Sequence, residues 1–133
     1  MPPCILIVDD EPVIMEVLVD MLSNKGYDSQ TCMDGREAFR AMNSLEFDLV
    51  ILDLNLPDIN GLEVADHLEM HHPETPIIFI TGDYSIEAKT LREECEGRID
   101  RMFVNKSTIS TTLFDAVESL LLATVKLHQS EIA

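Results

Sequence analysis

The sequence predicts an α/β domain built on a single doubly wound, mostly parallel β-sheet with helices on both faces. Five short segments with strand character alternate with segments in which apolar residues recur at helical spacing, which is typical of repeated β–α units. Most of these short segments are continuously apolar, and this favours strands buried on both faces of the sheet. We expect one domain over residues 1–133, with a core from about 4 to 127.

The composition excludes several classes of protein. Hydrophobic residues make up 46% of the chain, which excludes a disordered segment, and no apolar run is long enough to span a membrane. The net charge of −16 argues against direct binding of nucleic acid, whose phosphates require basic surfaces. Three scattered cysteines and a start at Met1-Pro2-Pro3-Cys4 without signal-peptide features favour a cytoplasmic protein with reduced thiols.

The first predicted strand, residues 4–8, ends at three consecutive acids, Asp9-Asp10-Glu11. A helix should follow, because apolar residues recur at helical spacing: Val13, Ile14, Val17, Leu18, Met21 and Leu22. Pro12 suits the first turn of this helix, and Gly26 suits the position after its end. One aspartate could be the N-cap, but a single cap does not require three acids.

The middle of the chain predicts two more strands, each followed by a helix. Residues 27–32 form a more polar strand, expected near an edge of the sheet, and residues 33–35 turn into a short helix with three inward side chains: Ala38, Phe39 and Met42. The strand over 49–52 is continuously apolar and ends at Asp53, before turn-forming residues that lead to Gly61. By itself, Asp53 could equally cap that turn.

The helix after this turn begins near Leu62 and ends near three histidines. His67, His71 and His72 could suggest a metal site, but no cysteine or carboxylate set completes the ligands. We interpret them as residues of a helix C-terminus, where the helix dipole favours positive charge.

The last third of the chain predicts two strands and two helices. A buried strand over residues 76–83 reaches a hydroxyl at Thr81, and a polar helix covers about residues 85–95. A loop over 96–100 leads to a short strand, residues 101–104, that runs into Asn105-Lys106. The final helix is expected from about Thr108 or Thr111 to Leu127, with a buried stripe: Leu113, Val117, Leu120, Thr124 and Leu127.

Four predicted strands end in polar or charged residues. In a parallel sheet, Asp9-Asp10, Asp53, Thr81 and Lys106 would lie at one edge, where open α/β sheets bind ligands. The converging carboxylates would repel one another without a cation, and an all-oxygen site suits Mg²⁺. An ammonium and a hydroxyl group suit phosphoryl oxygens. Asp53 is then placed as a nucleophile toward phosphorus, giving an acyl phosphate.

At these residues the chain resembles the receiver domains of two-component response regulators, the CheY-like family. The resemblance extends from Ile5 to about Leu127, and four motifs carry it: Ile7-Val8-Asp9-Asp10-Glu11, Leu52-Asp53-Leu54-Asn55-Leu56-Pro57 with Gly61, Ile80-Thr81-Gly82, and Lys106. It implies a flavodoxin-like five-stranded sheet of order 2-1-3-4-5. It also implies a signalling phosphoacceptor, served by a histidine kinase or a histidine phosphotransfer protein, and no enzyme beyond its own phosphorylation and dephosphorylation.

The resemblance implies a magnesium site around the phosphoacceptor. Asp53 would accept the phosphoryl group and would ligate Mg²⁺ together with Asp10 and the backbone carbonyl of Asn55. Asp9 would act on the metal through water. We therefore expect Mg²⁺ as the cofactor.

The resemblance also implies residues that respond to the phosphoryl group. Lys106 would contact it, Thr81 would be the switch hydroxyl, and Phe103 would be the switch aromatic, although core packing explains Phe103 equally well. The chain departs from the family at Ser107, where a proline usually follows the lysine. The turn over 105–108 then either keeps a costly non-proline cis peptide bond or takes another path.

Three other functions fit parts of the sequence. A hydrolase of the haloacid dehalogenase type needs a second acid two residues after its nucleophile, where this chain has Asn55. A flavin carrier needs a first loop that binds phosphate, whereas Asp9-Asp10-Glu11 would repel it. The remaining alternative is a receiver-like interaction module that is not regulated by phosphorylation.

The last helix predicts a contact with another protein. With its stripe on the sheet, Leu122 and Val125 point away from the sheet, and Lys126 is the only basic residue between Leu113 and Leu127. A charge-paired dimer is therefore poorly supported, and we expect a mainly apolar contact with a second copy or with a following domain. The chain would be either a single-domain regulator or the receiver of a longer protein.

Overall fold

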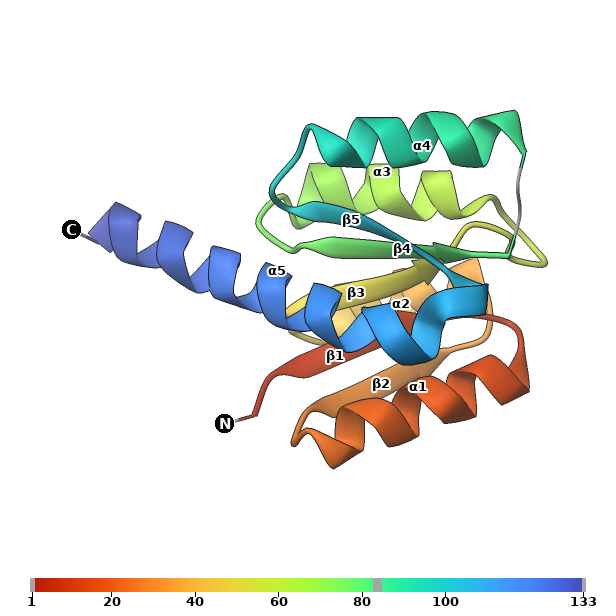
Figure 1. The fold of residues 1–133 in the computed structure, drawn as a ribbon, viewed down its shortest axis with the longest axis horizontal. Helices are drawn as coiled ribbons and strands as arrows, with labels where there is room; N and C mark the ends of the chain where they lie inside the picture. Colours follow the sequence, from red (N-terminus) through yellow and green to blue (C-terminus); the bar gives the residue numbers. More distant parts are fainter. Residues whose placement is uncertain (1, 83–84, 133) are drawn as a thin grey trace.

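The computed structural model describes residues 2–82 and 85–132, with side chains described as far as residue 123. In these residues, five parallel strands form one sheet in the order β2-β1-β3-β4-β5 (Figure 1). The strands are β1 (Cys4–Val8), β2 (Asp28–Cys32), β3 (Leu49–Asp53), β4 (Ile77–Thr81) and β5 (Arg101–Asn105). The predicted doubly wound parallel sheet and its strand order are confirmed.

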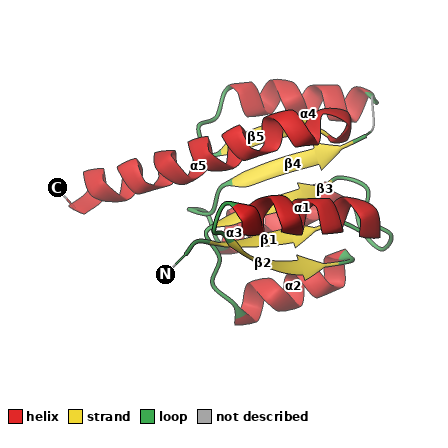
Figure 2. Cartoon of the chain, turned by 60° about the horizontal axis from the view of Figure 1, so that its bottom comes forward, coloured by secondary structure: helices red, strands yellow, loops and turns green. Residues whose placement is uncertain are grey.

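Helices cover both faces of the sheet. They are α1 (Pro12–Asn24), α2 (Gly35–Ser44), α3 (Gly61–His71), α4 (Ile86–Glu96) and α5 (Ile109–Ile132), with a 3₁₀ turn, η1 (Lys106–Thr108), before α5. Helices α1 and α5 pack on one face and α2, α3 and α4 on the other (Figure 2). No helix in the described part of the chain is long and apolar enough to cross a bilayer.

The central strands are buried because both of their faces are covered. Leu6 and Val8 of β1 pack toward α2, α3 and α4, whereas Ile5 and Ile7 pack toward α1 and α5, and all four side chains are inaccessible to solvent. This alternation explains the continuously apolar sequence of the central strands. The β2 strand is more polar because it is an edge strand, as its sequence predicts.

The structure corrects two details of α1. Val13 and Val17 fit the helical spacing but are 72% and 38% exposed, whereas Met15 is buried. The N-cap position is Glu11, not Asp9 or Asp10, and no side chain caps it. Instead, Asp9 Oδ1 accepts a hydrogen bond from the Glu11 N–H at 2.8 Å. The run of acids therefore shapes the turn between β1 and α1.

The turn after β5 takes a trans path. No described peptide bond is cis, and Asn105 Oδ1 accepts from the Ser107 N–H at 2.9 Å to start η1. Helix α5 consequently begins at Ile109, one residue after the first of its two expected starts, Thr108 and Thr111. The predicted buried stripe is confirmed at three positions: Leu113, Val117 and Leu120. Three further predicted positions fall outside the described side chains: Thr124, Val125 and Leu127.

Candidate functional site

The carboxyl ends of the parallel strands bring three aspartates together. Asp9 and Asp10 follow β1, Asp53 is the last residue of β3, and one carboxylate oxygen of each lies within 4.8 Å of the other two. Asp9 and Asp53 are buried and Asp10 is half-buried. With Glu11, Asn55, Gly82 and Lys106, two of these aspartates, Asp10 and Asp53, line an open cavity of about 440 Å³.

Lys106 extends from the end of β5 into this cluster of acids. Its ammonium donates to Asp53 Oδ2 at 2.9 Å and to Glu11 Oε1 at 2.8 Å, and it lies 3.1 Å from Asp9 Oδ2. Burial alone would lower the pKa of Lys106, but the hydrogen bonds to Glu11 and Asp53 and the charges of Asp53 and Asp9 outweigh it and raise the pKa. The lysine is therefore firmly protonated.

Glu11 is a member of the site that the sequence interpretation did not assign. It is the third of three consecutive acids, Asp9-Asp10-Glu11. Its side chain is 58% exposed, yet it contacts the ammonium of Lys106, whose side chain is 11% exposed. The signal available in the sequence was the extra acid itself, because neither a cap nor a metal site built from Asp9 and Asp10 requires it.

Asp9 is held in an environment that disfavours its charge. Its pKa is raised from the ordinary 3.8 to about 6, chiefly by burial and also by the negative charge of Asp53. The Glu11 N–H and Lys106 oppose this shift but do not cancel it. The buried Asp9 Oδ2 lies 3.1 Å from the Lys106 ammonium but accepts no hydrogen bond of good geometry from the described residues. An unsatisfied carboxylate oxygen beside two other carboxylates fits a site for a hard cation with oxygen ligands.

The loop between β3 and α3 is fixed at both of its ends. The Asn55 N–H donates to Asp53 Oδ1 at 3.1 Å, and Asn55 forms an antiparallel bridge with Asn60. Gly61 is required here, since a Cβ atom at this position would collide with the carbonyl oxygen of Asp53. This folding keeps the backbone of Asn55 beside the aspartates.

Asp58 attaches the same loop to the start of α2, a contact that the sequence interpretation missed. Its Oδ1 accepts from the Gly35 N–H at 2.9 Å and its Oδ2 from the Arg36 N–H at 3.0 Å. These backbone hydrogen bonds, led by that of Gly35, lower the pKa of Asp58. A Pro-Asp pair in a turn was the only signal in the sequence, and it did not indicate α2 as the partner.

Thr81 and Phe103 lie at different distances from this cluster. The register pairs Asp53 with Ile80, so Thr81 is one residue further along β4, at the same edge of the sheet, where it is buried. Phe103, in the middle of β5, packs against the core on the α2–α4 face and lines a separate groove between α4 and α5. The structure therefore brings Thr81 to the site edge but leaves Phe103 outside the acidic cavity.

His67 of α3 and His72, at the C-cap of this helix, pack against α2 rather than forming a metal site. His72 Nε2 donates to the carbonyl of Met42 at 3.0 Å, and the rings of His67 and Phe39 meet edge to face with centroids 4.8 Å apart. In the described part of the chain, the aspartate cluster is the only group of three potential ligands close enough to hold one ion. This supports the interpretation of the histidines as residues of a helix end.

Known proteins resemble this chain in sequence. The model of the response regulator receiver domain family matches residues 5–118. The probable transcriptional regulatory protein TcrX of Mycobacterium tuberculosis is 36% identical over 86 residues, which cover 65% of this chain and 37% of TcrX. The chain spans less than two fifths of the length of the curated relatives that it matches.

Solved structures resemble it in fold. A signal receiver domain of an HD domain-containing protein from Pseudomonas fluorescens has a TM-score of 0.82 and 30% identity, with 95% of this chain and 99% of that chain covered. The response regulator protein TrrA of Thermotoga maritima, in complex with Mg²⁺-BeF, has a TM-score of 0.76 and 36% identity, with 90% and 99% covered.

Proposed function

Because the chain belongs to the response regulator receiver domain family, we propose that it accepts a phosphoryl group on Asp53 and thereby changes its contact with a partner protein. The observation that carries the proposal is the hydrogen bond of 2.9 Å between Asp53 Oδ2 and Lys106, beside two further aspartates. The proposed receiver is one domain over residues 1–133. Its donor is a histidine kinase or a histidine phosphotransfer protein, in the cytoplasm.

The residues divide the chemistry between them. A carboxylate oxygen of Asp53 attacks phosphorus, the bond from phosphorus to the donor's leaving atom breaks, and the leaving atom keeps the electron pair. The product is an acyl phosphate on Asp53. Lys106 places a fixed positive charge beside the oxygens of the transferring group, where negative charge accumulates. Thr81 offers a hydroxyl donor at the same edge of the sheet.

The acidic cluster fits Mg²⁺. Asp10, Asp53 and the backbone carbonyl of Asn55 would hold the ion, with Asp9 acting through water, and the unsatisfied Asp9 Oδ2 supports this choice. When bound, Mg²⁺ neutralises the charge of the acids and of the phosphoryl oxygens. The complex of TrrA with Mg²⁺-BeF supports the same cofactor for a related protein.

The direct test is incubation with acetyl phosphate and Mg²⁺, followed by intact mass measurement. One added phosphoryl group supports the proposal, and beryllofluoride should bind the same carboxylate as a mimic of the product. A chain that binds its partner but never gains a phosphoryl group would instead be an interaction module that phosphorylation does not regulate.

Lys106 should be needed for phosphorylation itself, whereas Thr81 should be needed mainly for the response to the phosphoryl group. We expect Thr81→Ala to be phosphorylated at a rate within about threefold of wild type, because a neutral hydroxyl adds little to the charge balance. Lys106→Ala should slow phosphorylation by about a hundredfold, since it removes the positive charge at the transferring group. Initial rates with acetyl phosphate measure both effects. Equal and complete loss in the two variants would contradict this division.

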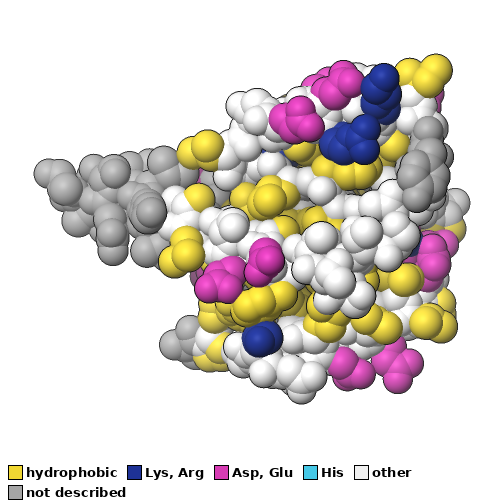
Figure 3. All heavy atoms as spheres, in the orientation of Figure 1, with side chains coloured by type: hydrophobic (Ala, Val, Ile, Leu, Met, Phe, Trp, Pro, Cys, Tyr) yellow, Lys and Arg dark blue, Asp and Glu magenta, His cyan; other side chains and the backbone are white. Residues whose placement is uncertain are grey.

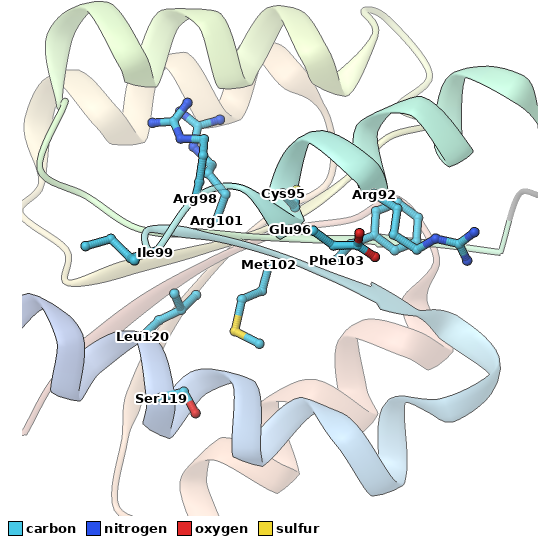
Figure 4. Close-up of a pocket in the computed structure, with 10 residues that line it drawn as sticks. All are labelled: Arg92, Cys95, Glu96, Arg98, Ile99, Arg101, Met102, Phe103, Ser119 and Leu120. Carbon is cyan, nitrogen blue, oxygen red and sulfur yellow. The ribbon is translucent and has the colours of Figure 1, made fainter.

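A groove between α4 and α5 is a candidate surface for contact with a partner protein. It has a volume of about 420 Å³, and its lining includes four apolar side chains: Ile99, Met102, Phe103 and Leu120. Figure 3 shows hydrophobic side chains gathered on this face of the molecule. In Figure 4, Arg98 and Arg101 point toward α3 and away from Met102, and both pair there with Glu69. Both arginines also line the groove, but their guanidinium groups are held at its α3 side by Glu69.

Leu122 supports the contact expected of the last helix. It is 56% exposed on α5, as its position outside the buried stripe predicts. We propose that α5 makes a mainly apolar contact with a second copy of this chain or with a following domain, strengthened when Asp53 is phosphorylated.

Sedimentation with and without beryllofluoride tests whether α5 mediates self-association of the chain. We expect beryllofluoride to promote association of the wild type, and Leu122→Glu to weaken this association at least about tenfold by placing a charge in an apolar contact. Met70→Glu is the matched control, because Met70 is 77% exposed on α3, away from α5. A monomer in both states, with Leu122→Glu indistinguishable from wild type, would count against self-association.

A further inference from the structure

Glu11 occupies a particular position relative to Lys106 and the aspartates. It accepts a hydrogen bond of 2.8 Å from Lys106, which at the same time donates to Asp53 at 2.9 Å. Glu11 does not belong to the three carboxylates whose oxygens lie within 4.8 Å of one another. Glu11 therefore contacts the ammonium group of Lys106 and is not one of the proposed metal ligands.

Glu11 also lines the cavity through which Asp53 is reached. A phosphodonor that enters this cavity carries negative charge on its phosphoryl group. The carboxylate of Glu11 acts against that charge in two ways: it repels the donor, and it competes with the phosphoryl oxygens for the hydrogens of the Lys106 ammonium. Since the Glu11 side chain is 58% exposed, water and ions weaken the repulsion, and the effect should depend on ionic strength.

We propose that Glu11 is a specificity-determining residue that selects against strongly anionic phosphodonors. The inference rests on the proposed phosphorylation of Asp53. A negative charge fixed at the cavity opposes a donor in proportion to the donor's own charge, so small dianions are disfavoured more than monoanions. A protein donor can offset this repulsion with contacts elsewhere on the surface, whereas a free small molecule cannot.

Two small donors that give the same product differ in the charge they bring. Acetyl phosphate is a dianion near neutral pH; Asp53 attacks its phosphorus, the phosphorus–oxygen bond breaks, and acetate leaves with the electron pair. Phosphoramidate is a monoanion because its nitrogen is protonated. When its phosphorus–nitrogen bond breaks, the nitrogen keeps the electron pair and leaves as ammonia, so no further proton is needed. In both reactions the product on Asp53 is the same acyl phosphate. A difference between donors therefore reports on their approach and transition state, not on the product.

The test compares initial rates of phosphorylation for wild type and Glu11→Gln with both donors, at saturating Mg²⁺ and low ionic strength. Glutamine keeps an oxygen that can accept from Lys106 and removes only the charge. We expect Glu11→Gln to raise the rate with acetyl phosphate about three- to tenfold, and the rate with phosphoramidate by about the square root of that factor. At about 0.5 M salt, both gains should largely disappear.

Glu16→Gln is the matched control, since it makes the same chemical change at an exposed position of α1, the helix that Glu11 precedes, and Glu16 is not among the residues that line the cavity. It should leave both rates unchanged. No gain in Glu11→Gln, or an equal gain with both donors, overturns the role of Glu11. A wild type that takes a phosphoryl group from neither donor overturns the proposed function instead, so the two failures are distinguishable.

Discussion

Replacing Asp53 by asparagine is expected to abolish phosphorylation. The amide of asparagine is a poor nucleophile toward phosphorus, and of the three aspartates only Asp53 both lines the cavity and accepts a hydrogen bond from Lys106. The rate with acetyl phosphate and Mg²⁺ should fall by at least about a thousandfold. The fold should persist, since the substitution removes one of three carboxylates that repel one another.

Intact mass before and after incubation measures this effect, and Asp66→Asn provides the control. Asp66 is an exposed residue of α3, so its replacement should leave both the rate and the extent of labelling unchanged. A phosphoryl group on Asp53→Asn at the wild-type level would show that another residue is the acceptor. If the wild-type protein gained a phosphoryl group only when unfolded, the proposed arrangement of the folded site would be contradicted.

Removing divalent cations is expected to make the stability of the protein fall as pH rises through the range in which Asp9 titrates. The pKa of Asp9 is about 6 in the folded protein, chiefly because of burial, against 3.8 ordinarily. At a pH between these two pKa values, Asp9 is protonated in the folded protein but ionised in the unfolded chain. Stability therefore decreases with rising pH over about pH 4–6 and stays lower above it. The lowered pKa of Asp58 acts in the opposite direction, but below its ordinary value of 3.8.

Mg²⁺ should reverse this loss. The ion requires ionised carboxylates, so it competes with the proton on Asp9, and its stabilising effect should be small near pH 5 and large near pH 8. At free Mg²⁺ of about 100 times the dissociation constant, the free energy of unfolding should rise by about 2.7 kcal/mol. Urea unfolding at both pH values, with and without Mg²⁺, measures the effect.

Two variants assign the pH dependence to the site. Asp9→Asn should flatten the decline in the free energy of unfolding between pH 4 and pH 6 in the absence of metal, because it removes the group that titrates. Asp20→Asn, at an exposed position of α1, should retain the decline. Coincident unfolding curves with and without Mg²⁺ near pH 8 would show that the aspartates do not form a metal site.

The sequence by itself determined the layers of the fold and the ends of its strands. Continuously apolar segments require cover on both faces, and a parallel sheet covered by helices provides it. Asp53 ends one such segment and precedes a run of turn formers, so its place at the edge of the sheet followed from local order alone. Hydrophobic periodicity is a property of neighbouring residues, which is why these features could be predicted.

Helical spacing predicted less well which residues of α1 are buried. Val13 and Val17 repeat at the correct interval, but the buried residues of α1 are Met15, Leu18 and Leu22, which lie on the opposite side of the helix. The spacing shows which residues share a side of the helix, not which side packs on the sheet. Similarly, η1 replaced the expected start of α5 because the side chain of Asn105 caps the turn.

Only the tertiary structure decided how the acids and the lysine share their contacts. Glu11 and Lys106 are separated by 95 positions in the sequence, and Asp58 and Gly35 by 23. Their hydrogen bonds exist because β1 and β5 end at one edge of the sheet and because the loop after β3 packs against the start of α2. A linear pattern carries no information about which of several neighbouring carboxylates an ammonium will contact. Packing of the strands and helices fixes those distances, and with them the charge that surrounds Asp53.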